Sequence, residues 1–299
     1  MAGKTLAVVG AGPGIGMAVA RRFGREGYRV ALIARNRVKL DGHVEELAAS
    51  NIEAAGFTAD VTDERLLRDA LEAARTRFGA IDVMEYSPMV SYDIVRPVLE
   101  IDTETARKTL DLYLLGPLTV VNAVLGPMLE KGEGALLFTS GASAVATYPS
   151  HGSVSVAMGA LRQYVRMLHA SLAHRGVYAG SIIVAQPPEP DLLADLYWAM
   201  VQDRDRPEHV FGTLEIGEAY ELLAARGFGP GFPPGLTAPL PEPRDDAERR
   251  TFLLGLYQAK INAMWHGDPQ AAEGRADHEA ARLGGKLGEI FYGVQVAEV

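Results

Sequence analysis

Short apolar runs alternate with amphipathic stretches along most of the chain. The runs are rich in Val, Ile, Leu and Ala and predict strands at Thr5–Val9, Tyr28–Ala34, Ala54–Thr58, Ile81–Met84, Ala135–Thr139 and Ala179–Ala185. Hydrophobic positions at helical spacing predict helices between them, one ending at Arg25 and others spanning Val38–Ala49, Glu64–Phe78, Arg107–Val124 and Val154–His174. Strands that alternate with helices indicate an α/β fold with a Rossmann-like, doubly wound parallel sheet.

The pattern changes after residue 212, where glycine and proline become frequent. A helix-like segment, Glu215–Arg226, precedes Gly227–Pro243, whose glycines and prolines exclude regular structure. Helical spacing returns at Asp245–His266 and Ala271–Leu287, and Phe291–Val296 is a candidate late strand. We therefore divide the chain into an α/β domain (1–212), a connector or lid (213–244) and a helical C-terminal extension (245–299).

Composition and charge exclude several classes of protein. The 299 residues are 48% hydrophobic and 22% charged, which is ordinary for a soluble globular protein. A net charge of −9 offers no basic footprint for nucleic acid or an anionic membrane. Cysteine is absent and the histidines show no paired ligand spacing, so we expect neither disulfides nor a metal site. Without a signal peptide or an apolar run of about 20 residues, a cytoplasmic location is expected.

The first predicted strand leads into a glycine-rich turn, Gly10-Ala11-Gly12-Pro13-Gly14-Ile15-Gly16, and a helix follows. Glycines there allow a tight reversal and let backbone N–H groups approach a diphosphate at the positive end of the helix. Close packing of helix on strand is the alternative use of such a turn. The strand–turn–helix context favours a nucleotide site built by Gly10, Gly12, Gly14, Ile15 and Gly16.

The spacing of Gly10, Gly14 and Gly16 is G-x-x-x-G-x-G rather than the common G-x-G-x-x-G. This turn resembles that of the short-chain dehydrogenase/reductase (SDR) family, and the resemblance extends from about Lys4 to Gly212. It implies an SDR-like dinucleotide-binding domain, an NAD(P)-dependent oxidoreductase activity and a small-molecule substrate. It also implies a homo-oligomer, because the helix equivalent to Val154–His174 often builds the subunit interface in the family. The family's last strand, with its Val-Asp-Gly-Gly-like turn, has no counterpart here.

The end of the second predicted strand indicates which cofactor is bound. NAD binders carry an acidic residue here for the ribose 2′-hydroxyl, whereas NADP binders carry a basic group for the 2′-phosphate. Ala34 stands at the acidic position and is followed by Arg35, Asn36 and Arg37, so NADP(H) is favoured over NAD(H). Solvated loop arginines are the alternative.

The end of the third predicted strand resembles the family's adenine contact. There the Asp60 carboxylate meets the exocyclic amine and Val61 covers the ring. A helix cap is the other explanation for Asp60, since a helix begins just after it.

Two turns depart from the family's pattern. Glu85-Tyr86-Ser87-Pro88 replaces an Asn-Asn-Ala-Gly turn, which puts the Glu85 carboxylate and the Tyr86 phenol near the cofactor, together with Ser87. Tyr113 stands where the family has an inward asparagine that holds a water. Ser140, with Ser143 three positions later, occupies the place of the catalytic serine.

The family's Tyr-x-x-x-Lys pair is missing from the long helix. There the tyrosine exchanges a proton with the substrate oxygen, and the lysine lowers the tyrosine pKa. Aligned on Ala160-Leu161, the pair falls on Val154 and Met158, neither of which transfers a proton. This departure resembles a divergent branch of the SDR family. The remaining candidates for proton transfer are Ser140, Tyr113, Ser143, Tyr148 and His151; for His151 an ordinary surface-loop histidine is the alternative.

Three hypotheses about function follow. In the first, the protein reduces a small carbonyl- or imine-type compound with NADP(H) and a relocated acid. In the second, the nucleotide is structural and the reaction is a dehydration, isomerisation or cyclisation. In the third, the protein is a catalytically silent nucleotide-binding module. The first is the main prediction.

Overall fold

The computed structural model describes residues 3–185, 189–212, 214, 219, 222, 242–265 and 279–284. Within these residues, seven parallel strands form one sheet in the order β3-β2-β1-β4-β5-β6-β7. They span Thr5–Val9 (β1), Arg29–Ala34 (β2), Ala54–Thr58 (β3), Val83–Tyr86 (β4), Gly134–Gly141 (β5), Val177–Val184 (β6) and Glu208–Phe211 (β7). The strand order reverses between β1 and β4, which confirms the doubly wound sheet.

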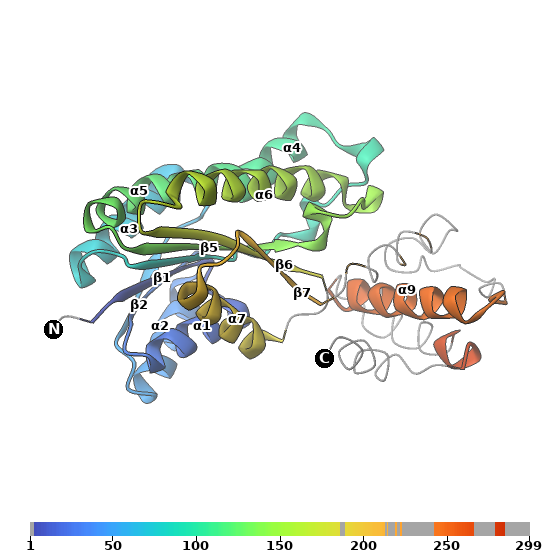
Figure 1. The fold of residues 1–299 in the computed structure, drawn as a ribbon, viewed down its shortest axis with the longest axis horizontal. Coiled ribbons are helices and arrows are strands. Elements are labelled where there is room, and N and C mark those ends of the chain that lie inside the picture. The colour runs from blue at the N-terminus through green and yellow to red at the C-terminus, as the bar shows by residue number, and fades with distance from the viewer. Residues whose placement is uncertain are drawn as a thin grey trace.

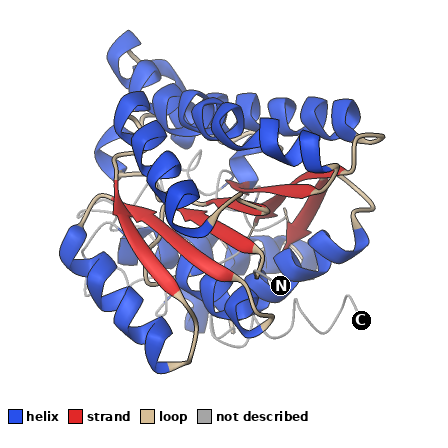
Figure 2. Cartoon of the chain, turned by 90° about the vertical axis from the view of Figure 1, so that its left-hand side faces the viewer, coloured by secondary structure: helices blue, strands red, loops and turns tan. Residues whose placement is uncertain are grey.

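Helices cover both faces of the sheet (Figure 1 and Figure 2). One face carries α1 (Ile15–Arg25), α2 (Arg37–Ala49) and α7 (Pro190–Asp203). The other carries α3 (Glu64–Phe78), α4 (Thr103–Leu110), α5 (Gly116–Lys131) and α6 (Gly152–Leu172). Because both faces are covered, β1 is buried along its whole length and reads as a continuous apolar run.

Helix starts follow from polar side chains. Asn36, Asp63 and Asp102 each accept a hydrogen bond from the backbone N–H three residues later, which caps α2, α3 and α4. The cap explains why α3 begins where the sequence predicts. No side chain caps α1, whose N-terminus adjoins the glycine turn.

The bounds of the predicted strands β4, β5 and β6 are corrected, and one strand is added. β6 covers Val177–Val184 instead of Ala179–Ala185. β4 covers Val83–Tyr86 instead of Ile81–Met84, because Glu85 and Tyr86 pair with Val8 and Val9 of β1. β5 continues through Ser140 and Gly141, which pair with β6 beyond the expected end at Thr139. A seventh strand does exist: Glu208–Phe211 pairs with β6 at the sheet edge, earlier in the chain than a family-like last strand. Local patterns missed these residues because cross-strand pairing decides where a strand ends.

The helix predicted over Arg107–Val124 begins earlier, ends later and contains a π-helical turn, Asp111–Leu115, between α4 and α5. Pro117 has no N–H, and the Gly116 N–H bonds to the Asp111 carbonyl one residue further back than in an α-helix. The Leu112 carbonyl is thereby released. It accepts a hydrogen bond of 2.6 Å from the buried Tyr86 hydroxyl, so β4 is tied to this helix.

Tyr86→Phe is expected to destabilise the protein by about 1–3 kcal/mol, because the Leu112 carbonyl then loses its buried partner. The midpoint of urea unfolding measures the change. Tyr164→Phe is the matched control, since the half-buried Tyr164 hydroxyl has no hydrogen bond within the described part of the chain. Equal midpoints for the two variants would contradict this role of Tyr86.

The same long helix, Thr103–Lys131, meets the length and composition of a membrane span, alone among the described helices. Half of the most apolar stretch of this helix is buried inside the fold. It packs against α3 and α6, which accounts for its apolar character.

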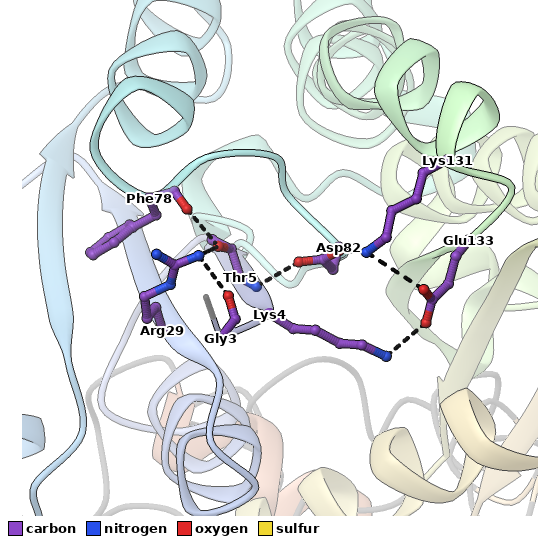
Figure 3. A network of polar contacts seen from close by, with 8 residues as sticks. All are labelled: Gly3, Lys4, Thr5, Arg29, Phe78, Asp82, Lys131 and Glu133. Atoms are coloured by element: carbon purple, nitrogen blue, oxygen red, sulfur yellow. Dashed lines mark hydrogen bonds and ion pairs between the residues drawn. The ribbon is translucent and has the colours of Figure 1, made fainter. Parts of the chain in front are cut away.

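A polar network joins the amino-terminal ends of the central strands, opposite the glycine turn (Figure 3). The Asp82 carboxylate accepts from the Thr5 N–H at 2.8 Å and from Lys131 Nζ at 2.5 Å. Lys4 pairs with Glu133 at 2.7 Å. The network stabilises the sheet at this end. The candidate site described below lies at the opposite end, where the strands have their carboxyl ends.

The C-terminal part of the chain is described only in segments. The helix α9 (Asp246–Trp265) confirms the helix predicted at Asp245–His266. The interpretations made for Glu215–Arg226, Gly227–Pro243, Ala271–Leu287 and Phe291–Val296 lie wholly or mostly outside the described residues.

Candidate functional site

A cavity of about 510 Å³ opens at the carboxyl ends of β1, β2 and β3. It is the point at which the strand order reverses, where doubly wound sheets bind ligands. Its wall includes the first part of the glycine turn, the ends of β2 and β3, the start of α2 and the loop after β4. The lining residues used below are Gly10, Gly12, Arg35, Asn36, Lys39, His43, Asp60, Val61 and Pro88.

The glycines of the turn fall into two groups. Gly10 has φ +95°, and a Cβ there would lie 2.5 Å from the Pro88 nitrogen; a Cβ on Gly16 would lie 3.1 Å from Val8 Cγ1. Backbone geometry and packing therefore explain Gly10 and Gly16. At Gly12 the nearest atom would be 3.8 Å away, and at Gly14 none lies within 4 Å.

Packing alone does not require glycine at Gly12 and Gly14. They border open space at the uncapped N-terminus of α1, where unused N–H groups and the helix dipole favour an anion. The turn thus fits a diphosphate. Ile15 is the first residue of α1. The cavity lining does not include Gly14, Ile15 or Gly16.

The two arginines that follow β2, Arg35 and Arg37, have different surroundings. Arg35 lines the cavity, is mostly exposed and lies 3.8 Å from the Asp60 carboxylate. Arg37 pairs with Asp41 at 2.9 Å and donates to the Gly56 carbonyl, and it is not part of the lining. Asn36 uses its side-chain oxygen to cap α2.

Sequence reasoning missed two groups at this end of the cavity. Lys39 and His43 are four residues apart on α2, so both lie on the face that lines the cavity. The buried His43 Nε2 has no hydrogen-bond partner among the described residues. The i, i+4 spacing directly after the arginines was the available signal.

Asp60 and Val61 both lie in the cavity wall. Asp60 accepts hydrogen bonds from the backbone N–H and hydroxyl of Thr62, whereas Asp63 is the residue that caps α3. The helix-cap explanation of Asp60 is therefore wrong, and its second oxygen faces Arg35.

The ends of β4 and β5 carry buried polar groups. Ser140 is 2% exposed, and its hydroxyl has no hydrogen-bond partner among the described residues; the same holds for Ser87 Oγ and Glu85 Oε2. Unpartnered buried polar atoms are rare and often mark a ligand site. Tyr86, in contrast, is fully buried, and its hydroxyl donates to the Leu112 carbonyl. Its side chain therefore stabilises the contact between β4 and the long helix.

Val154 and Met158 lie at the start of α6, beside the end of β5. Val154 is 4% exposed and belongs to the core. Met158 Sδ lies 3.3 Å from the Gly141 nitrogen and 3.5 Å from Ser143 Oγ. The side of α6 that faces Ser143 is thus apolar, and Ser143 itself contacts a thioether.

None of the five candidate acids is part of the cavity lining, Ser140 and Ser143 included. Tyr113 is 3% exposed in the core beside the π-helical turn. Tyr148 is buried, and its ring meets His151 edge-on at 6.2 Å between centroids, just before α6. His151 Nδ1 is 2.8 Å from Ser150 Oγ. Among the described residues, no cluster of His, Asp and Glu could hold a metal ion.

A parallel sheet with a glycine turn, an uncapped helix N-terminus and a cavity at the switch point is the arrangement found in nucleotide-binding α/β proteins. The sequence model of the short chain dehydrogenases matches residues 4–187, more than half of the chain. The chain belongs to this family, and it is an SDR-type oxidoreductase.

Several relatives are named as dehydrogenases or reductases. The chain is 23% identical over 223 residues to a diacetyl reductase [(S)-acetoin forming] of Staphylococcus epidermidis, covering 74% of this chain and 83% of the relative. It is 28% identical over 180 residues to D-threitol dehydrogenase of Mycolicibacterium smegmatis, covering 60% and 68% of the two chains.

Solved structures share the fold. A metagenomic short-chain oxidoreductase in complex with NADP superimposes with a TM-score of 0.65 at 21% identity, over 71% of this chain and 97% of the other. L-sorbose reductase from Gluconobacter frateurii, complexed with NADPH and L-sorbose, gives 0.65 at 16% identity, over 70% and 95%.

Proposed function

We propose that the protein is an NADP(H)-dependent reductase of small carbonyl- or imine-type compounds that lacks the Tyr-x-x-x-Lys pair. The observation that carries this proposal is the open space at Gly12 and Gly14 above the N-terminus of α1. The cavity continues from this turn to Arg35 and Lys39, which are suited to a 2′-phosphate. The NADP and NADPH bound by structurally similar proteins support the choice of cofactor.

Each part of the cofactor has candidate residues. We assign the diphosphate to the turn from Gly10 to Gly16, of which Gly10 and Gly12 line the cavity. The adenine is assigned to Asp60 and Val61, and the 2′-phosphate to Arg35 with Asn36. When bound, reduced nicotinamide supplies a hydride. Ser140 positions the substrate oxygen, because its buried hydroxyl has no other described partner.

Arg35→Ala is expected to weaken NADPH binding about 10- to 100-fold and to leave NADH binding unchanged, because one charge-assisted contact to the 2′-phosphate is lost. Arg37→Ala is the matched control, since Arg37 is held by Asp41 and Gly56 outside the cavity lining. Fluorescence titration of both nucleotides measures the affinities. An equal loss for NADPH and NADH would refute a role for Arg35 in phosphate recognition.

The reaction itself is tested with a panel of small ketones, aldehydes and imines. The proposed function requires a substrate-dependent fall in NADPH absorbance. Turnover of a compound with no change in NADPH would favour the non-redox reaction, for which the apolar Val154 and Met158 are the supporting observation. Nucleotide binding without any turnover would favour a regulatory module.

We also propose that the protein is a homo-oligomer. Apolar side chains are exposed on the outer helices at Leu115 (50%), Val156 (62%) and Met167 (53%). A second copy that covers them would remove apolar surface from water. Light scattering is expected to give a mass of at least two chains, and Val156→Lys is expected to lower it.

A further inference from the structure

Asp111 lies in the wall of the nucleotide cavity, on a different element from the residues assigned to the cofactor above. It is the first residue of the π-helical turn between α4 and α5. Lys108 and Leu112, from the same helical run, line the cavity as well. Residues three and four positions apart lie on one face of a helix, so this face of the run is turned toward the cavity.

The π-helical turn packs directly against the segment after β3 that contains Asp60 and Val61. A Cβ built on Gly116 would stand 2.9 Å from the Val61 carbonyl oxygen and 3.2 Å from the Asp111 carbonyl oxygen. The two segments can approach so closely because Gly116 has no side chain between them. Asp60 and Asp111 consequently lie on adjacent parts of the cavity wall.

Both carboxylates can accept further hydrogen bonds. Asp60 Oδ1 accepts from the backbone N–H and the hydroxyl of Thr62. Asp60 Oδ2 lies 3.8 Å from Arg35, which is beyond hydrogen-bond distance. The Asp111 carboxylate takes part in no hydrogen bond or ion pair within the part of the chain that the structure describes. Each acid therefore has an oxygen to offer to a ligand.

The surroundings of the two acids suit a flat ring with a polar rim. Lys108 does not neutralise Asp111, because its ammonium group pairs with Glu104 at 2.7 Å. The cavity lining also contains apolar side chains from the segments after β3 and β4 and from the π-helical turn, namely Ala59, Val61, Met89, Ile94 and Leu112. Such a surface covers an aromatic base, and the carboxylates then meet polar groups at its rim.

The charge of these acids selects the kind of base. A carboxylate only accepts hydrogen bonds, so two of them favour a group that donates two. The exocyclic amine of adenine is such a group, since it carries two hydrogens on one nitrogen. A purine with a carbonyl oxygen at the same position presents an acceptor instead, which leaves both carboxylates unpaired and facing a like partial charge.

We propose that Asp111 is a specificity-determining residue for the nucleotide base. Its carboxylate accepts one hydrogen of the adenine amine, and Asp60 accepts the other. The inference rests on the proposed function, in which the cavity holds the adenosine half of NADP(H). It extends the adenine site from the segment after β3 to the π-helical turn, and it restricts the ligand class to 6-aminopurine nucleotides.

The test compares NADPH with its hypoxanthine analogue, in which a carbonyl oxygen replaces the adenine amine, by fluorescence titration. The wild-type protein is expected to bind NADPH about 100-fold more tightly than the analogue, because two charge-assisted hydrogen bonds are lost. Asp111→Ala is expected to weaken NADPH binding about 10-fold without weakening the analogue, so the preference falls about 10-fold.

Two further variants separate recognition from support of the fold. Asp111→Asn is expected to bind the analogue about 10-fold more tightly than the wild type does, because an amide N–H can donate to the carbonyl oxygen. Asp69→Asn is the matched control, since Asp69 is exposed on α3, pairs with Arg65 and lies outside the cavity lining. It is expected to behave as wild type with both nucleotides.

Three results would overturn the inference: equal affinity of the wild type for the two nucleotides, equal weakening of both by Asp111→Ala, or no change of either in that variant. The proposed function is decided separately. Wild-type protein that binds NADPH but reduces no compound of the panel contradicts the reductase activity, while the base preference still decides the role of Asp111. If the wild type binds neither nucleotide, the cofactor assignment and this inference fail together.

Discussion

Gly14→Ala is expected to weaken NADPH binding about 10-fold or more, while Gly10→Ala is expected mainly to destabilise the fold. At Gly14 no atom lies within 4 Å of an added Cβ, so the methyl group enters space that the proposed diphosphate occupies. At Gly10 the Cβ would meet the Pro88 nitrogen at 2.5 Å on a backbone with φ +95°. The strained backbone and the collision are expected to cost about 3 kcal/mol.

Calorimetric titration with NADPH and thermal unfolding, applied to both variants, separate the two effects. Gly42→Ala is a suitable control, because Gly42 lies within α2 with nothing within 4 Å of its Cβ and outside the cavity lining. If Gly14→Ala bound NADPH as tightly as Gly42→Ala, the space above α1 would not be the diphosphate site.

The second large effect concerns stability and pH. Burial raises the pKa of Glu85 to about 8 in the folded protein, whereas the unfolded chain releases this proton near the ordinary pKa of 4.5. Stability from this group is therefore complete below about pH 4.5 and is lost as the pH rises to about 8. At about pH 8 the loss is on the order of 4 kcal/mol, since each pKa unit corresponds to about 1.4 kcal/mol.

Glu85→Gln is expected to remove this pH dependence, because glutamine keeps the shape of the side chain and does not ionise. Urea unfolding of both proteins between about pH 5 and pH 9 provides the comparison. The unfolding free energy of the wild type should fall relative to the variant as the pH rises. Parallel curves would show that Glu85 ionises normally in the folded protein.

The fold was largely predictable because its signals are local. A buried parallel strand is mostly apolar along its length, and Thr5–Val9 and Ala135–Thr139 show this pattern directly. The strand ends were less predictable, because Glu85 and Glu208 lie in strands through pairing with neighbours distant in sequence. Glutamate has low strand propensity, and tertiary context overrode it.

The candidate site was predictable where backbone geometry dominates. The positive φ of Gly10 and the open space at Gly14 follow from a motif visible in the sequence. Side-chain direction was not predictable: Arg35 lines the cavity, yet Arg37, two residues later, turns to Asp41. The contact between Glu85 and Thr139 joins residues 54 positions apart, and no sequence period reports it.

The measurement that tests the account most directly is calorimetric titration of the wild-type protein with NADPH, compared with NADH. The account predicts saturable binding of one NADPH per chain, with NADH bound more weakly. The absence of binding for both nucleotides would contradict it, because the glycine turn would then serve only to pack α1 on the sheet.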